Sequence, residues 1–117
     1  MKLHYNFYLS LALIFSLSLN VFAEDLKLQI ESGKKIYREN CIACHGDKGD
    51  GRGPAAVAIP GTKPRNFIEG KYKYGETSKE IFKTLTEGVP GTAMPPWASL
   101  SEKDRWAVIA YIKSLKK

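Results

Sequence analysis

The run C-x-x-C-H at positions 41–45 constrains this chain more than any other feature, because it contains both cysteines of the 117-residue sequence. Cysteines at this spacing serve in disulfides, redox motifs, metal sites and haem attachment. A structural zinc site needs four protein ligands, and a thioredoxin-like dithiol belongs to a βαβ unit, of which the sequence shows no sign. A disulfide between Cys41 and Cys44 would close a loop too short to stabilise much. The histidine that follows Cys44 favours haem attachment, for which C-x-x-C-H is the signature.

The spacing of the motif also has a geometric meaning. On one helical turn, positions i, i+3 and i+4 lie on the same side. Cys41 and Cys44 can therefore bond to the two vinyl groups of one porphyrin, while His45 ligates the iron. We expect one covalently bound haem c, with its iron, as the cofactor.

The first 23 residues have the pattern of a secretory signal peptide. Lys2 precedes an apolar run over residues 7–19, and Val21 and Ala23 occupy the −3 and −1 positions before an acidic pair. The alternative is an uncleaved membrane anchor, for which this run is short. We expect export to the periplasm, with residues 24–117 as one mature domain, and membrane contact only if the first segment is retained.

Removal of residues 1–23 reduces the number of side chains that could ligate the iron. His45 is then the only histidine and Met94 the only methionine. Histidine–methionine ligation is an established pairing for a c-type haem and raises its reduction potential. Pro95 and Pro96 stiffen the loop around Met94, and Gly91 permits a tight approach. The alternative is that Met94 fills an apolar gap. We predict His45 and Met94 as the axial ligands of a low-spin iron.

The rest of the chain reads as helices joined by long Gly/Pro loops. Residues 46–75 contain seven glycines and three prolines without a regular period, which predicts an irregular segment. Three helices are expected around it. The first carries an apolar stripe into the motif, the second has a capping box and a glycine stop, and the third is apolar through its centre. The residues that define them are Leu26, Ile30, Gly33 and Tyr37; Thr77, Glu80, Ile81, Phe82, Leu85 and Gly88; and Ser101, Asp104, Trp106 to Ile112 and Leu115.

On these motifs, residues 28–115 resemble a class I cytochrome c of the bacterial mono-haem type. Gly33 and Tyr37 match the first-helix positions of that family that cross the last helix, and Tyr111 matches the aromatic residue of the last helix. The segment 91–95 matches its methionine loop. The resemblance implies a small all-α cytochrome c fold of three to five helices wrapped around one haem.

The resemblance also implies roles for individual pocket residues. The sequence Gly53-Pro54 matches the Gly-Pro whose carbonyl receives the Nδ1 proton of the haem histidine, which would orient His45. Trp97 is expected either to donate its ring N–H to a haem propionate or to pack in the core. Arg52 and Arg65 are candidate propionate partners, with a solvated surface position as the alternative. Five further residues are expected to line the haem: Phe67, Tyr72, Tyr74, Leu85 and Val89.

With both axial positions filled, the iron has no open site for substrate, and the predicted function is single-electron transfer between redox partners rather than enzymatic catalysis. The net charge falls from +6 to +5 when the N-terminal segment, with one lysine and no acid, is removed. This charge is consistent with a solvated surface or with an acidic-faced partner. The partner is expected to be a redox protein or a larger oxidoreductase complex, not nucleic acid. Two alternatives remain open: a haem peroxidase or gas-binding protein with a labile Met94, and a haem-free dithiol protein.

Overall fold

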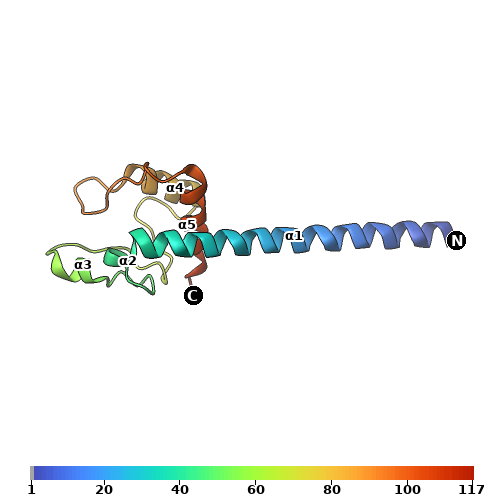
Figure 1. Ribbon diagram of the computed structural model, residues 1–117, viewed down its shortest axis with the longest axis horizontal. Helices are drawn as coiled ribbons and strands as arrows, with labels where there is room; N and C mark the ends of the chain where they lie inside the picture. The colour runs from blue at the N-terminus through green and yellow to red at the C-terminus, as the bar shows by residue number, and fades with distance from the viewer. Residues whose placement is uncertain (1) are drawn as a thin grey trace.

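The computed structural model describes the backbone of residues 2–117 and the side chains of Tyr8, Ser10 and residues 20–117. That part of the chain contains helices and no strand, which confirms the predicted all-α fold (Figure 1). The elements in chain order are α1 (Lys2–Asn40), α2 (Ile42–His45), α3 (Pro54–Ala58), α4 (Ser78–Glu87) and α5 (Glu102–Ser114).

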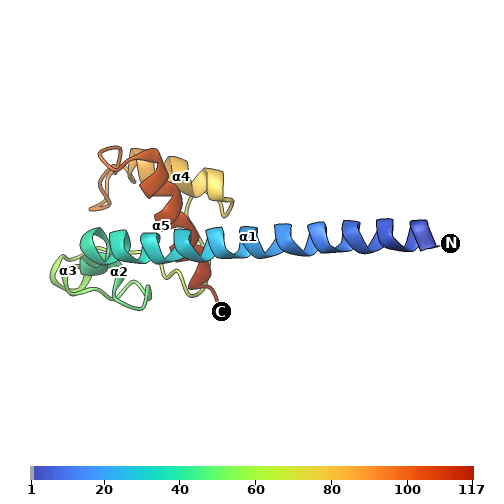
Figure 2. The same ribbon diagram turned by 45° about the vertical axis from the view of Figure 1, so that its right-hand side comes forward.

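Helix α1 determines the shape of the molecule. It has 39 residues, so its axis is about 58 Å long, and its N-terminal part projects away from the other elements (Figures 1 and 2). Residues 20–29 are all exposed, and the predicted cleavage site after Ala23 lies inside the continuous helix. Within the described residues, no helix has an apolar stretch long enough to cross a membrane. The signal peptide stays a prediction.

The second part of α1 crosses α5 (Figure 2), and Gly33 lies at this crossing. A Cβ atom added to Gly33 would collide with the carbonyl group of Ala107, so only glycine allows the two backbones to approach this closely. One turn further along α1, the ring centroids of Tyr37 and Tyr111 lie 5.1 Å apart. This crossing agrees with the predicted roles of the three residues.

The predicted apolar stripe on α1 is shorter than the sequence indicates. Leu26 keeps 52 % of its surface exposed, whereas Tyr37 is completely buried. Leu26 lies seven residues before Gly33, about 10 Å along the helix axis, and α5 does not extend that far. Leu26 therefore lies on the predicted stripe of α1 but outside the core.

The predicted helix caps are present. The Thr77 hydroxyl accepts a hydrogen bond from the Glu80 amide at 3.2 Å, and the Glu80 carboxylate accepts one from the Thr77 amide at 3.0 Å. This reciprocal pair satisfies amides that the first turn of α4 leaves free. Gly88 ends α4 with φ of +71°. At the start of α5, the Ser101 hydroxyl accepts from the Asp104 amide at 3.1 Å.

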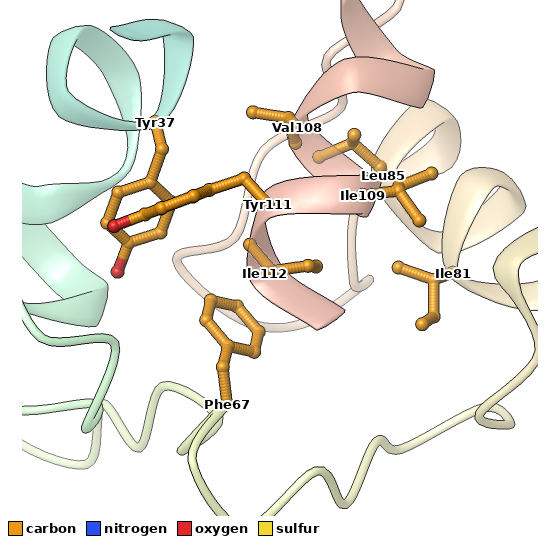
Figure 3. Packing of buried hydrophobic residues seen from close by; sticks show 8 residues of the cluster. All are labelled: Tyr37, Phe67, Ile81, Leu85, Val108, Ile109, Tyr111 and Ile112. Carbon is orange, nitrogen blue, oxygen red and sulfur yellow. The ribbon is translucent and has the colours of Figure 1, made fainter. Parts of the chain in front are cut away.

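The hydrophobic core lies where α5 meets α1 on one side and α4 on the other (Figure 3). Helix α5 is the most deeply buried element, since five of its six residues from Ala107 to Ile112 are buried. The segment 46–75 is irregular as predicted, apart from the short α3. The core cluster consists of Tyr37, Phe67, Ile81, Leu85, Val108, Ile109, Tyr111 and Ile112.

Candidate haem site

The C-x-x-C-H motif forms a single turn directly after α1. The amide of Cys41 donates to the Tyr37 carbonyl at 2.8 Å, and the amides of Cys44 and His45 both donate to the Cys41 carbonyl, at 3.2 and 2.9 Å. This is the helical geometry that brings positions i, i+3 and i+4 to one side. We call residues 41–46 the histidine turn.

The chain after His45 folds back onto the histidine turn. The amide of Gly51 donates to the His45 carbonyl at 2.8 Å, and that of Gly53 to the Cys44 carbonyl at 3.0 Å. These bonds satisfy carbonyl groups that the end of a helix leaves free. A Cβ at Gly53 would collide with the Ala43 carbonyl group, so this close return requires glycine.

Tyr37 of α1 also stabilises the histidine turn through a hydrogen bond. Its hydroxyl donates to the Gly46 carbonyl at 2.6 Å inside the core, and Gly46 has φ of +80°. Burial raises the pKa of the Tyr37 phenol, so the hydroxyl keeps its proton and remains a donor. The sequence identified Tyr37 only as a helix-crossing residue, and its hydrogen bond becomes visible only once α1 and the turn are placed together.

The His45 ring is oriented by two contacts. It stacks on Phe67, with ring centroids 4.5 Å apart and planes inclined by 18°, and its Nδ1 lies 3.2 Å from the Arg65 carbonyl oxygen. A carbonyl can only accept, so Nδ1 carries the proton and Nε2 keeps a lone pair. Burial lowers the pKa of His45 despite the opposing effect of the Arg65 carbonyl. A neutral ring with a free Nε2 is the form that ligates a metal.

The structure corrects the predicted acceptor for His45, which is the Arg65 carbonyl and not that of Pro54. Pro54 is the first residue of α3, and the carbonyl groups of a helix point along its axis. The segment that contains Arg65 instead passes close to the chain that folds back onto the histidine turn, since a Cβ at Gly51 would lie 2.6 Å from the Pro64 carbonyl oxygen.

A cavity of about 500 Å³ opens beside the histidine turn, within the size range of cofactor pockets. Its lining joins residues from segments far apart in the sequence. They include Cys44 and His45 of the turn, Phe67 and Tyr72 of the irregular segment, and Val89 and Met94 beyond α4.

Several predicted pocket residues lie elsewhere among the described side chains. Leu85 belongs to the hydrophobic core, and the Trp97 side chain packs against that core. The Trp97 amide also donates to the Leu85 carbonyl at 2.9 Å. Tyr74 keeps 51 % of its surface exposed. These three and Pro54 are not part of the cavity wall, and Cys41 packs against the core beside it.

Met94 lies in a loop over residues 88–97, which we call the methionine loop. The Val89 amide donates to the Met94 carbonyl at 3.1 Å and closes the loop. The Thr92 hydroxyl donates to the Val89 carbonyl at 2.7 Å and accepts from the Met94 amide at 3.2 Å. The sequence did not single out Thr92.

Gly91 requires glycine for its backbone conformation. Its φ is +74°, which side chains disfavour. An added Cβ would meet no protein atom within 4 Å, and Gly91 contributes to the cavity wall. The close approach in this loop is at Gly88, where a Cβ would lie 2.7 Å from the Pro95 carbonyl carbon.

The polar groups of the cavity wall are suited to an anionic ligand. Lys63, Arg65 and Lys73 contribute to the wall, and none of the lining residues is an aspartate or glutamate. The Tyr72 hydroxyl is buried and has no hydrogen-bond partner in the described part of the protein. A buried donor without a partner costs free energy, and the carboxylates of a haem are acceptors that would satisfy it.

The environment of the cysteines also fits a haem. Both thiols are free, and burial, assisted by the nearby Cys44, raises the pKa of the Cys41 thiol to about 11. Among the described residues, no three His, Cys, Asp or Glu side chains gather as a protein-only metal site. Two free thiols at the C-x-x-C-H spacing are what the thioether attachment of a haem requires.

Comparisons with known proteins agree with this site. The family model described as "Cytochrome c" matches residues 30–116. The chain is 34 % identical over 100 residues to the cbb3-type cytochrome c oxidase subunit CcoP of Azospirillum sp. (strain B510), a match that covers 85 % of this chain and 32 % of that protein. It is 35 % identical over 89 residues to a thiosulfate dehydrogenase of Stutzerimonas stutzeri (strain A1501), covering 73 % and 27 %.

A solved structure shows the same fold. A chain of the reducing HAO-like protein complex of Kuenenia stuttgartiensis superposes with a TM-score of 0.69 at 36 % identity, covering 74 % of this chain and 42 % of that one. The present chain spans about a third of the length of the curated relatives. The similarity therefore concerns one domain of larger proteins, which include both oxidase subunits and a dehydrogenase.

Proposed function

This chain belongs to the cytochrome c family, and from that premise we propose that it is a mono-haem carrier of single electrons between protein partners. Covalently bound haem c, with its iron, is the cofactor of the family, and the C-x-x-C-H motif provides its attachment. When bound, the haem supplies a one-electron Fe(III)/Fe(II) couple.

The observation that carries the proposal is that His45 and Met94 line one cavity from different segments of the fold. Cys41 and Cys44 would hold the haem through thioethers. His45 would ligate the iron through Nε2, because Nδ1 faces the Arg65 carbonyl, and Met94 would ligate it through sulfur. Phe67 would fix the orientation of the His45 ring by stacking.

Ligation of the iron by both His45 and Met94 would restrict the chemistry of the site. Substrate could then not reach the metal, so bond-making catalysis would be disfavoured and single-electron transfer favoured. The neutral His45 ring and the apolar Phe67 add no charge on the histidine side of the cavity. The Tyr72 hydroxyl and the cationic part of the wall would bind the haem carboxylates.

The location and partners are extensions of this proposal. The signal-peptide pattern of residues 1–23 supports export to the periplasm. The names of two relatives, an oxidase subunit and a thiosulfate dehydrogenase, support a redox protein or a larger oxidoreductase as the partner. A partner with an acidic docking face would make the electron-transfer rate fall steeply with salt, and a rate independent of salt would contradict this.

A visible spectrum of the exported protein, oxidised and then reduced, tests the proposal. We expect a low-spin c-type spectrum with a methionine-to-iron absorption in the oxidised form, and a porphyrin that stays with the protein after acid–acetone extraction. Met94→Ala should keep the haem attached, abolish that absorption and lower the reduction potential. An unchanged potential would contradict ligation by Met94.

Carbon monoxide distinguishes the carrier from a reactive haem protein. The reduced wild-type protein should bind it poorly, because Met94 holds the sixth position, and Met94→Ala should bind it readily. Rapid stoichiometric binding by the wild type would favour the peroxidase or gas-binding alternative.

A further inference from the structure

Arg105 of α5 reaches back to the last residue of the methionine loop and to the residues that follow it. Its Nη1 donates to the carbonyl oxygens of Leu100 at 2.7 Å, Ala98 at 3.2 Å and Trp97 at 3.4 Å. One nitrogen with two hydrogens shares these acceptors, so the shortest bond is the strongest. A guanidinium stays charged in proteins, and charged donors form stronger hydrogen bonds than neutral ones. Arg105 therefore ties residues 97–100 to α5.

The guanidinium is itself held between helices. Its central carbon lies 4.9 Å from the centroid of the Phe82 ring on α4, a cation–π distance. The Phe82 ring stacks on Trp106 of α5 at 4.3 Å. A planar guanidinium can stack and donate at the same time, which a lysine ammonium cannot reproduce. Arg105 thus joins α4, α5 and the segment 97–100 at one point.

This junction lies next to Met94 in the sequence. The Trp97 amide donates to the Leu85 carbonyl of α4 at 2.9 Å, so Trp97 is bonded to α4 through its N–H and to Arg105 through its carbonyl. Only Pro95 and Pro96 separate Trp97 from Met94, and their fixed φ angles limit how far the two residues can move independently.

We propose that Arg105 is a positioning residue for Met94, which keeps the methionine loop closed over the cavity by anchoring its C-terminal end. This inference rests on the proposed function, in which Met94 is an axial ligand. Loss of the anchor would raise the population of an open loop in which the sixth position is available. The apparent affinity for an external ligand rises in proportion to the population of the binding-competent state.

Titration of the oxidised exported holoprotein with imidazole measures that population. We expect Arg105→Met to bind imidazole about tenfold more tightly than the wild type, because a charged hydrogen bond of the closed state is lost. Arg105→Lys should lie between the two, since it keeps a charged donor without the planar fork. The matched control is Lys103→Met, which removes one positive charge from an exposed position on the same turn and should leave the affinity unchanged.

The outcomes separate this inference from the proposed function. If Arg105→Met and the wild type both show the methionine-to-iron absorption and their imidazole affinities agree within twofold, Arg105 does not position Met94, although Met94 remains the ligand. If the wild type lacks that absorption, ligation by Met94 is wrong and the inference is overturned with it. A lower unfolding midpoint in guanidinium with unchanged imidazole affinity would assign Arg105 a structural role only.

The inference can still be tested if the Arg105→Met protein does not accumulate. Should Arg105→Met fail to yield holoprotein, Arg105→Lys is titrated alone. An affinity about threefold above that of the wild type supports the inference, and an affinity within a factor of 1.5 overturns it.

Discussion

The two segments that carry the proposed iron ligands are built differently. The histidine turn is held by core residues: Tyr37, which is completely buried, donates to Gly46, and the buried Phe67 stacks on His45. The methionine loop lies on the surface, where most of its residues are exposed and its closing bonds run through Val89 and Thr92.

This contrast indicates how each ligand would be lost. A segment that shares its contacts with the core opens only when the protein unfolds, whereas a segment held by a few exposed hydrogen bonds opens locally at lower cost. His45 should therefore leave the iron only on global unfolding. Met94 should exchange while the rest of the protein stays folded.

A pair of glycine substitutions gives the largest expected contrast. Gly53→Ala would place a methyl group against the Ala43 carbonyl, and because backbone cannot move aside easily, we expect a loss of about 3 kcal/mol in the free energy of unfolding. Gly91→Ala meets no atom and should cost about 1 kcal/mol through its positive φ alone. Guanidinium denaturation of the two holoproteins measures both; equal losses would contradict the contrast.

Tyr37→Phe tests whether the histidine turn depends on the core. The buried Gly46 carbonyl would lose its 2.6 Å partner, and we expect a loss of about 2 kcal/mol in the free energy of unfolding. The imidazole affinity of the oxidised protein should stay within twofold of that of the wild type. A large rise in that affinity would mean that the two ligand segments are coupled.

Thr92→Val makes the complementary change in the methionine loop. It removes the hydroxyl that joins the Val89 carbonyl and the Met94 amide. We expect a loss below about 1 kcal/mol in global stability, because the site is exposed, but a roughly threefold increase in imidazole affinity. Thr86→Val is the matched control, since it removes a hydroxyl that donates within α4 to the Phe82 carbonyl at 2.8 Å and should leave imidazole binding unchanged.

Tyr72→Phe gives the smallest expected effect. Loss of the buried hydroxyl would remove a donor to a haem carboxylate, leave more negative charge near the iron and favour Fe(III). We expect the midpoint potential to fall by roughly 20–40 mV, less than the ~59 mV that corresponds to a tenfold change in a one-electron equilibrium. Tyr74→Phe, at a half-exposed position outside the cavity wall, should leave the potential unchanged. Equal midpoint potentials for the two variants would show that the Tyr72 hydroxyl does not donate to a haem carboxylate.

Much of the fold followed from local sequence patterns. Thr77 with Glu80, and Ser101 with Asp104, specify helix starts through bonds between near neighbours, so the sequence suffices to locate them. Gly33 and Tyr37 were recognised because their spacing before the motif resembles that of a family. Leu26 shows the limit of periodicity, since an apolar helix position becomes core only if another element covers it.

The pocket was predicted less well, because its wall is assembled from separate segments. Arg65 rather than Pro54 faces His45, since the register of the irregular segment against the histidine turn is decided by backbone hydrogen bonds between residues far apart. Of the two positions predicted for Trp97, the structure shows the one against the core. The roles of Thr92 and Arg105 depend on carbonyl groups that no side-chain pattern reveals.

The sequence alone determined the chemistry of this protein: a C-x-x-C-H turn, one histidine and one methionine in the predicted mature domain, and helices with their own start signals. These depend on residue type and on contacts within a few positions. The tertiary structure decided which backbone carbonyl orients His45, which side chains line the cavity and what holds the methionine loop, because those contacts exist only after distant segments have packed together.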